Sequence, residues 1–115
     1  MSNFTGGCST LDPELVSIFI NETSEQVERL VFILLQLEPN PDRQSEFIDE
    51  MFRIAHNIKG SAGIMGLTQL KDVLHELESL FSLVRDKTYF LENKEIDLLL
   101  KLTDDLTSFF EGDFI

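Results

Sequence analysis

Apolar residues recur at intervals of three and four positions along most of the chain, and this helical periodicity constrains the fold more than any other feature. The pattern falls into four segments, at approximately residues 13–38, 41–65, 68–86 and 93–112. No stretch of strand length alternates between apolar and polar residues. Because the connections between the segments are short, neighbouring helices should run antiparallel. The sequence therefore predicts an all-α fold, an antiparallel up-and-down four-helix bundle.

The ends of these segments carry residues that start or stop helices. Asp12 precedes Pro13, so Asp12 can cap the first helix, and Pro13 at the first helical position loses no hydrogen bond. We expect Thr68 to cap the third helix and Asn93 to cap the fourth. Gly112 suits the C-terminal end of the fourth helix.

Charge, length and apolar content exclude several classes of protein. The 115 residues include 9 Lys plus Arg and 21 Asp plus Glu, and the net charge of −12 excludes general nucleic-acid binding and disfavours docking on anionic lipid. No Gly-rich phosphate loop occurs, and the length excludes a complete nucleotide-driven kinase. The apolar runs are too short for membrane insertion, and the single Cys8 fits a reducing compartment. We therefore expect a cytoplasmic domain.

Three parts are expected along the chain. Residues 1–11 form a flexible N-terminal leader, residues 12–111 form the bundle, and residues 112–115 start a linker or mark a truncated boundary. An isolated bundle with a hydrophilic outer face should be monomeric.

The most informative segment is residues 55–66, in which two glycines lie inside the predicted second helix. Each glycine costs about 1 kcal/mol of helix stability relative to alanine. A helical wheel places Gly60 and Gly63 beside His56, on a face turned away from the apolar stripe. Without glycine side chains, the backbone of another protein or a phosphate can approach the imidazole closely. An exposed helical histidine is usually without function, but these glycines and Lys59, one turn further on, favour a functional His56.

Two further polar candidates lie on the predicted third helix. Glu78 falls at the edge of the apolar face, and His75 lies three residues earlier on the same side. A carboxylate at that boundary can reach a histidine on the neighbouring helix. A solvated charge at the seam is the alternative, and the residues leave both interpretations open.

These two segments resemble a known family. Residues 52–67, with the core His-Asn-Ile-Lys-Gly-Ser-Ala-Gly at 56–63, resemble the phosphoacceptor helix of histidine phosphotransfer (HPt) domains. Residues 74–78, Leu-His-Glu-Leu-Glu, are similar to the second motif of the chemotaxis-kinase (CheA) subgroup of that family. The resemblance covers approximately residues 12–111 and implies the same helical bundle that the periodicity predicts.

The resemblance also implies roles for individual residues. His56 would accept a phosphoryl group from the ATP-binding kinase domain of a larger protein and pass it to an aspartate in the receiver domain of a response regulator. Glu78 would accept a hydrogen bond from Nδ1–H of His56, which leaves Nε2 free to attack. Lys59 would offset the charge of the phosphoryl group. His75 either completes this polar network or packs at the seam.

Gly60 and Gly63 are the expected contacts with the partner, and Phe52 is either a further contact or a residue at the edge of the core. Arg53, Lys59 and Lys71 fall on or near the His56 region, so the acidic domain is expected to keep a local cationic spot. The chain itself should bind no cofactor or metal, with magnesium and ATP brought by the partner domains. It would thus be a phosphoacceptor and phosphodonor module, and its parent protein an ATP-dependent protein histidine kinase.

Three alternatives remain. The chain can be an HPt module of a non-chemotaxis phosphorelay. It can be a metal-binding bundle that uses His56, His75, Glu76 and Glu78, although the usual Glu-x-x-His order is reversed here and His56 faces outward. It can also be an interaction bundle that needs no phosphorylation, but such a bundle has no reason to surround an exposed histidine with a lysine and two glycines.

Overall fold

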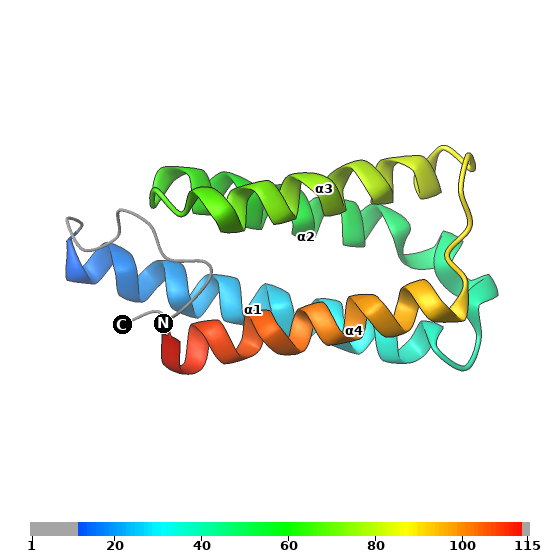
Figure 1. Ribbon diagram of the computed structural model, residues 1–115, viewed down its shortest axis with the longest axis horizontal. Helices are drawn as coiled ribbons and strands as arrows, with labels where there is room; N and C mark the ends of the chain where they lie inside the picture. The colour runs from blue at the N-terminus through cyan, green and yellow to red at the C-terminus, as the bar shows by residue number, and fades with distance from the viewer. Residues whose placement is uncertain (1–11, 114–115) are drawn as a thin grey trace.

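The computed structural model describes residues 12–113, which form four α-helices and two short helical turns. In chain order these are α1 (Pro13–Leu37), η2 (Pro41–Arg43), α2 (Gln44–Ile64), α3 (Thr68–Arg85), α4 (Asn93–Ser108) and η3 (Phe109–Asp113). The four α-helices run alternately up and down around a shared core (Figure 1). The described residues contain no strand, and the predicted all-α four-helix bundle is confirmed.

The expected leader, residues 1–11, and the last two residues, 114–115, lie outside the described residues. Residues 112–113 continue the helical turn η3. The domain boundaries expected at 12 and 111 therefore stay a prediction.

Helix α1 begins, and helix α2 ends, where the sequence predicts. The Asp12 side chain accepts a hydrogen bond at 2.8 Å from the backbone N–H two residues on. Pro13 takes the first helical position, where its missing N–H costs nothing. Gly66 follows the end of α2 with a φ of 75°, a left-handed conformation that suits glycine. This turn sends the chain back along α2 as α3.

The starts of α3 and α4 each differ by one residue from the prediction. Leu67, and not Thr68, precedes α3, and it makes no side-chain capping bond. Glu92, and not Asn93, precedes α4, and its N–H donates to the Glu95 side chain at 2.7 Å. Thr68 and Asn93 as caps are therefore wrong, because the cap is the residue at which the backbone turns helical and each of these is already inside its helix.

Helix α4 does not end at Gly112. Its α-helical part ends at Ser108, and the wider turn η3 continues through Gly112. Phe109 and Phe110 are both buried, and the Phe110 ring packs edge-on to Phe19 of α1 with centroids 5.6 Å apart. The wider turn thus carries two consecutive aromatic side chains into the core.

The core lies between the four helices. Six apolar residues that recur at helical spacing in the segment 41–65 are all buried, and these are Ile48, Met51, Ala55, Ile58, Ala62 and Met65. On α1 not every apolar residue at helical spacing reaches the core, because Leu15 and Ile18 are exposed. The first turns of α1 project past the ends of the other helices (Figure 1), and in this part of α1 Phe19 is buried whereas Leu15 and Ile18 are exposed.

Gln44 joins the start of α2 to the loop between α3 and α4. Its Oε1 accepts from the N–H of Leu91 at 2.8 Å, and its Nε2 donates to the Leu91 carbonyl at 2.9 Å. A third bond runs from Nε2 to the carbonyl of Pro41, also at 2.9 Å. The Gln44 side chain is buried, so these bonds satisfy polar groups that have no access to water.

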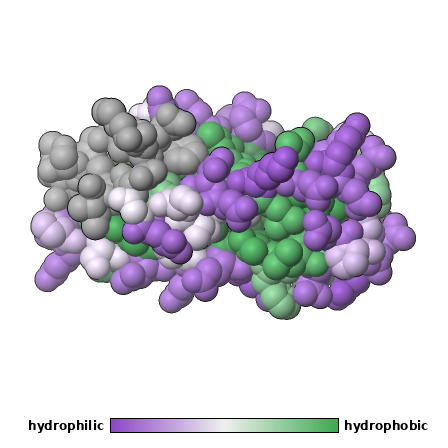
Figure 2. Space-filling view, turned by 60° about the horizontal axis from the view of Figure 1, so that its bottom comes forward, coloured by the Kyte–Doolittle hydropathy of each residue, from purple (hydrophilic) through white to green (hydrophobic). Residues whose placement is uncertain are grey.

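Hydrophobic side chains gather in one area of the face formed by α1 and α4, between hydrophilic ones (Figure 2). The exposed hydrophobic residues of these helices include Leu35 on α1 and Leu98 on α4. The outer face is therefore not uniformly hydrophilic, and the monomeric state stays a prediction. Among the described residues, no helix combines the length and the apolar character needed to cross a membrane.

Candidate functional site

Helices α2 and α3 pack more closely than any other pair of described elements, and they bring His56 opposite Glu78. The ring nitrogen Nδ1 of His56 is hydrogen-bonded to Oε2 of Glu78. Because an ionised carboxylate can only accept, Nδ1 carries the proton in this pair. The His56 side chain is 60% exposed, whereas that of Glu78 is 14% exposed. The predicted contact between an exposed histidine and a carboxylate at the helix seam is therefore present.

Lys59 occupies the second oxygen of the same carboxylate. Its Nζ donates to Oε1 of Glu78 at 2.6 Å. This hydrogen bond is the main reason why the pKa of Glu78 lies below its usual value, and the bond from His56 adds to the effect while partial burial opposes it. Glu78 is thus held in its ionised form. Lys59 acts first on this carboxylate, and its predicted role toward a phosphoryl group stays a prediction.

The hydrogen bond between His56 and Glu78 leaves the second ring nitrogen of His56, Nε2, available for reaction. Nε2 makes no hydrogen bond to any described residue, and the tautomer set by Glu78 leaves it with a lone pair. An imidazole held in this way is a nucleophile whose opposite side already has an acceptor for its proton. The positive charge that develops on the ring during attack meets the negative charge of Glu78.

Gly60 and Gly63 place no side chains on the surface beside His56. A Cβ added at Gly60 meets nothing within 4 Å. A Cβ added at Gly63 meets Cδ and Cε of Lys71 at 3.5 and 3.8 Å, which are ordinary contact distances. Packing within the described residues therefore does not require glycine at either position, and the helix carries both at a cost in stability.

The structure does not bring His75 into the polar network. The His75 and Glu76 side chains are exposed, and neither makes a hydrogen bond or ion pair with another described residue. No group of three or more His, Cys, Asp and Glu side chains in the described part of the chain could hold a metal ion. The alternative of a metal site built from His56, His75, Glu76 and Glu78 has no such group to rest on.

The three cations of the expected cationic spot lie in different environments. Lys59 is bonded to Glu78, as described above. The stem of Lys71 crosses Gly63, about two helical turns from His56. Arg53 is exposed, and its charge helps to lower the pKa of Glu50. Only Lys59 is therefore bonded to the histidine–carboxylate pair.

An aromatic ring lies on the other side of His56. The Phe52 ring, one helical turn earlier, is nearly parallel to the imidazole, with an interplanar angle of 7° and centroids 6.3 Å apart. Phe52 is half-buried and packs against the core, so it combines the core-edge position with partial access from outside. Arg85 of α3, which the sequence did not single out, places its guanidinium carbon 4.1 Å from the centre of the Phe52 ring.

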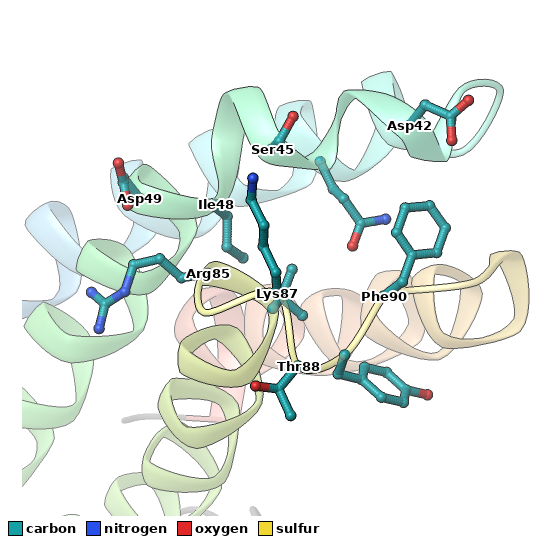
Figure 3. A pocket seen from close by; sticks show the side chains of 11 residues that line it. Asp42, Ser45, Ile48, Asp49, Arg85, Lys87, Thr88 and Phe90 are labelled. Atoms are coloured by element: carbon teal, nitrogen blue, oxygen red, sulfur yellow. The ribbon is translucent and has the colours of Figure 1, made fainter.

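Two pockets open along the seam between α2 and α3. A shallow one of about 400 Å³ is lined by Phe52, Glu78, Ser79, Ser82 and Leu83, directly beside the pair. A larger one of about 680 Å³ lies between the start of α2 and the α3–α4 loop (Figure 3). Neither His56 nor Glu78 lines the larger pocket. Because the His56 side chain is 60% exposed, the active site of another protein can reach it.

Comparisons with known proteins identify the family of the chain. The family model described as Hpt domain matches residues 14–109. The chain is 36% identical over 91 residues to the chemotaxis protein CheA of Borreliella burgdorferi. It is 33% identical over 92 residues to CheA of Listeria monocytogenes, and 32% identical over 99 residues to CheA of Treponema pallidum.

These matches cover most of this chain but a small part of each relative. The matched stretches make up 79%, 80% and 86% of this chain, and 10%, 15% and 12% of the three relatives in the same order. No solved structure matches the chain. Because the family model covers nearly all of the described residues, the chain belongs to the Hpt domain family.

Proposed function

We propose that this chain is the histidine phosphotransfer domain of a chemotaxis-type two-component histidine kinase, and that His56 is the residue that carries the phosphoryl group. The observation that carries the proposal is the pairing of an exposed imidazole with an ionised, largely buried carboxylate at the α2–α3 seam. The relatives named above are all chemotaxis proteins, and nothing favours the alternative of a non-chemotaxis phosphorelay.

In the first step the lone pair on Nε2 of His56 attacks the terminal phosphorus of ATP, which the kinase domain of the parent protein supplies. A nitrogen–phosphorus bond forms, and the phosphorus–oxygen bond to ADP breaks. The proton on Nδ1 stays in its hydrogen bond with Glu78, and the carboxylate balances the positive charge of the ring.

In the second step a carboxylate oxygen of an aspartate in the receiver domain attacks the phosphorus. The nitrogen–phosphorus bond breaks, and its electron pair returns to Nε2. No proton leaves the ring in either step, so His56 and Glu78 end as they began. Magnesium and ATP belong to the partner domains, and this chain provides a nucleophile in a fixed tautomer.

Phe52, Gly60 and Gly63 are the residues that we propose as partner contacts. They flank His56 on its exposed side, and the two glycines allow a second backbone to come close. Lys59 keeps Glu78 ionised and is near enough to the pair to offset charge on the phosphoryl group. Such a chain would work in the cytoplasm, where the receiver domain and ATP are found.

The experiment is transfer of labelled phosphate from the kinase domain of a CheA relative to the purified chain. We expect label in an acid-labile, base-stable form that is absent from His56→Gln. His75→Gln serves as the matched control, because His75 is also exposed on a helix of the same bundle. Label that persists in His56→Gln, or that is lost in His75→Gln instead, would show that the carrier is assigned wrongly.

A further inference from the structure

Phe52 and Arg85 form an arrangement that the phosphoryl transfer described above does not use. The Phe52 ring lies parallel to the imidazole of His56, at a centroid separation of 6.3 Å that is within the range of offset aromatic stacking. Arg85 comes from the other helix of the seam and lies 4.1 Å from the centre of the same ring. We call this arrangement the Arg85–Phe52–His56 stack.

The contact of Arg85 is unlike those of the other arginines that lie over rings. Arg29 and Arg43 lie 5.1 and 5.3 Å from the ring centres below them. Both also hold a carboxylate, with the Nε of Arg29 at 2.6 Å from Glu50 and the Nε of Arg43 at 3.1 Å from its own partner. Arg85 lies closer to its ring, and its contact with a carboxylate, Asp86, is at 4.0 Å. The Phe52 ring is therefore its principal partner.

The direction of the Arg85 side chain supports this. Arg85 lines the edge of the pocket at the start of α2, and its guanidinium points away from Lys87 and Phe90 of that pocket (Figure 3). The position of Arg85 on α3 is about two turns beyond Glu78, whereas Phe52 lies about one turn before His56 on the antiparallel helix α2. Residues of α3 therefore contact both rings: Glu78 binds Nδ1 of the His56 imidazole, and Arg85 lies over the Phe52 ring beside it.

An exposed imidazole has two torsions to restrain. The hydrogen bond to Glu78 holds one ring atom, and a second contact is needed to hold the plane of a side chain that is 60% exposed. The parallel Phe52 ring supplies that contact, and Phe52 is itself held from α3 by a cation over its face.

We infer that Arg85 is a positioning residue for the phosphoacceptor: through Phe52 it holds the plane of the His56 imidazole, so that Nε2 is presented in one direction. The inference rests on the proposed function of His56. It assigns to Arg85 an effect on the reactivity of the imidazole itself and not on the binding of a protein partner.

The test uses phosphoramidate, a small phosphodonor that phosphorylates histidine without a protein partner. We expect Arg85→Gln to slow phosphate uptake at His56 by about twofold to fivefold. This factor corresponds to the loss of one exposed cation–π contact. Arg85→Lys, which keeps the cation, should give an intermediate rate. Arg43→Gln is the matched control, because it removes another arginine from a ring on the same molecule, and it should react at the rate of the unmodified chain.

Two measurements separate positioning through Phe52 from other roles. Arg85→Gln in a Phe52→Leu background should cause no further slowing, because the two residues act in series. Relaxation of isotope-labelled His56 should report a more mobile ring in Arg85→Gln, with unchanged mobility in Arg43→Gln. Thermal melting checks that each variant is folded.

Several outcomes would overturn the inference. One is that Arg85→Gln reacts with phosphoramidate at the rate of the unmodified chain. If only transfer from the kinase domain is then slowed, Arg85 is a docking contact and not a positioning residue. Another is full additivity with Phe52→Leu. Failure of the unmodified chain to take up label at His56 would instead refute the proposed function, whereas the ring mobility would still test the positioning by Arg85.

Discussion

Replacing Glu78 by Gln isolates the charge of the carboxylate from its shape. Glutamine keeps an oxygen that can accept from Nδ1–H of His56, but it carries no negative charge. It also cannot serve Lys59 and His56 with two equivalent oxygens, as Glu78 does. The change therefore weakens the preference of His56 for the tautomer protonated at Nδ1. It also removes the negative charge that balances the ring while it attacks phosphorus.

The size of the effect follows from the contacts of Glu78. A hydrogen bond to a charged group contributes about 1.5–3 kcal/mol, compared with about 1 kcal/mol for a neutral pair. The difference of about 0.5–2 kcal/mol corresponds to a rate lower by about twofold to thirtyfold. Because the Glu78 side chain is only 14% exposed, water screens the lost charge weakly, and we expect the upper part of this range.

The assay is single-turnover uptake of phosphate from phosphoramidate, together with nitrogen NMR of the imidazole. We expect Glu78→Gln to react slowly and to show less of the tautomer protonated at Nδ1. Glu76→Gln makes the same charge change two residues away at an exposed position and should behave as the unmodified chain does. A folded Glu78→Gln that reacts at the unmodified rate would refute the reasoning, as would an equal loss in Glu76→Gln.

Three further predictions concern stability and access. Gln44→Leu should lower the free energy of unfolding by about 2 kcal/mol in urea denaturation, because the buried backbone groups of Leu91 lose their partner, and an unchanged midpoint would contradict this. Gly60→Ala should raise that free energy by about 1 kcal/mol, since an added Cβ meets nothing within 4 Å, and should slow transfer from a protein partner while uptake from phosphoramidate stays the same. The pKa of Glu78 in the folded chain lies below its ordinary value of about 4.5, so the folded state binds fewer protons than the unfolded state. The stabilisation from Glu78 should therefore be present above about pH 4.5 and be lost as the pH falls through the lower folded value, and Glu78→Gln should remove this part of the acid dependence.

Features that depend on nearby residues were predicted well. The apolar stripe of α2 is buried as expected, the cap at Asp12 is where the sequence places it, and the turn at Gly66 falls in the gap between the second and third predicted segments. The errors at Thr68 and Asn93 are one residue in size, because a good capping residue type does not by itself determine where the backbone becomes helical. The exposure of Leu15 and Ile18 does not follow from spacing along the chain, because the way the helices pack decides which side of α1 meets the core.

The sequence by itself determined the helical class and the four segments. It also determined that His56 faces outward beside Gly60 and Gly63, because helical periodicity depends only on spacing along the chain. It left Glu78 as either a partner of His56 or a solvated charge. The tertiary structure decided that question, since the pairing joins residues 22 positions apart and needs the exact register of α2 against α3. The same register places Arg85 over the Phe52 ring and brings Lys59 within hydrogen-bond distance of Glu78. It leaves His75 without a contact to the His56–Glu78 pair. Such register is set by the packing of the whole core, and no local pattern of residues encodes it.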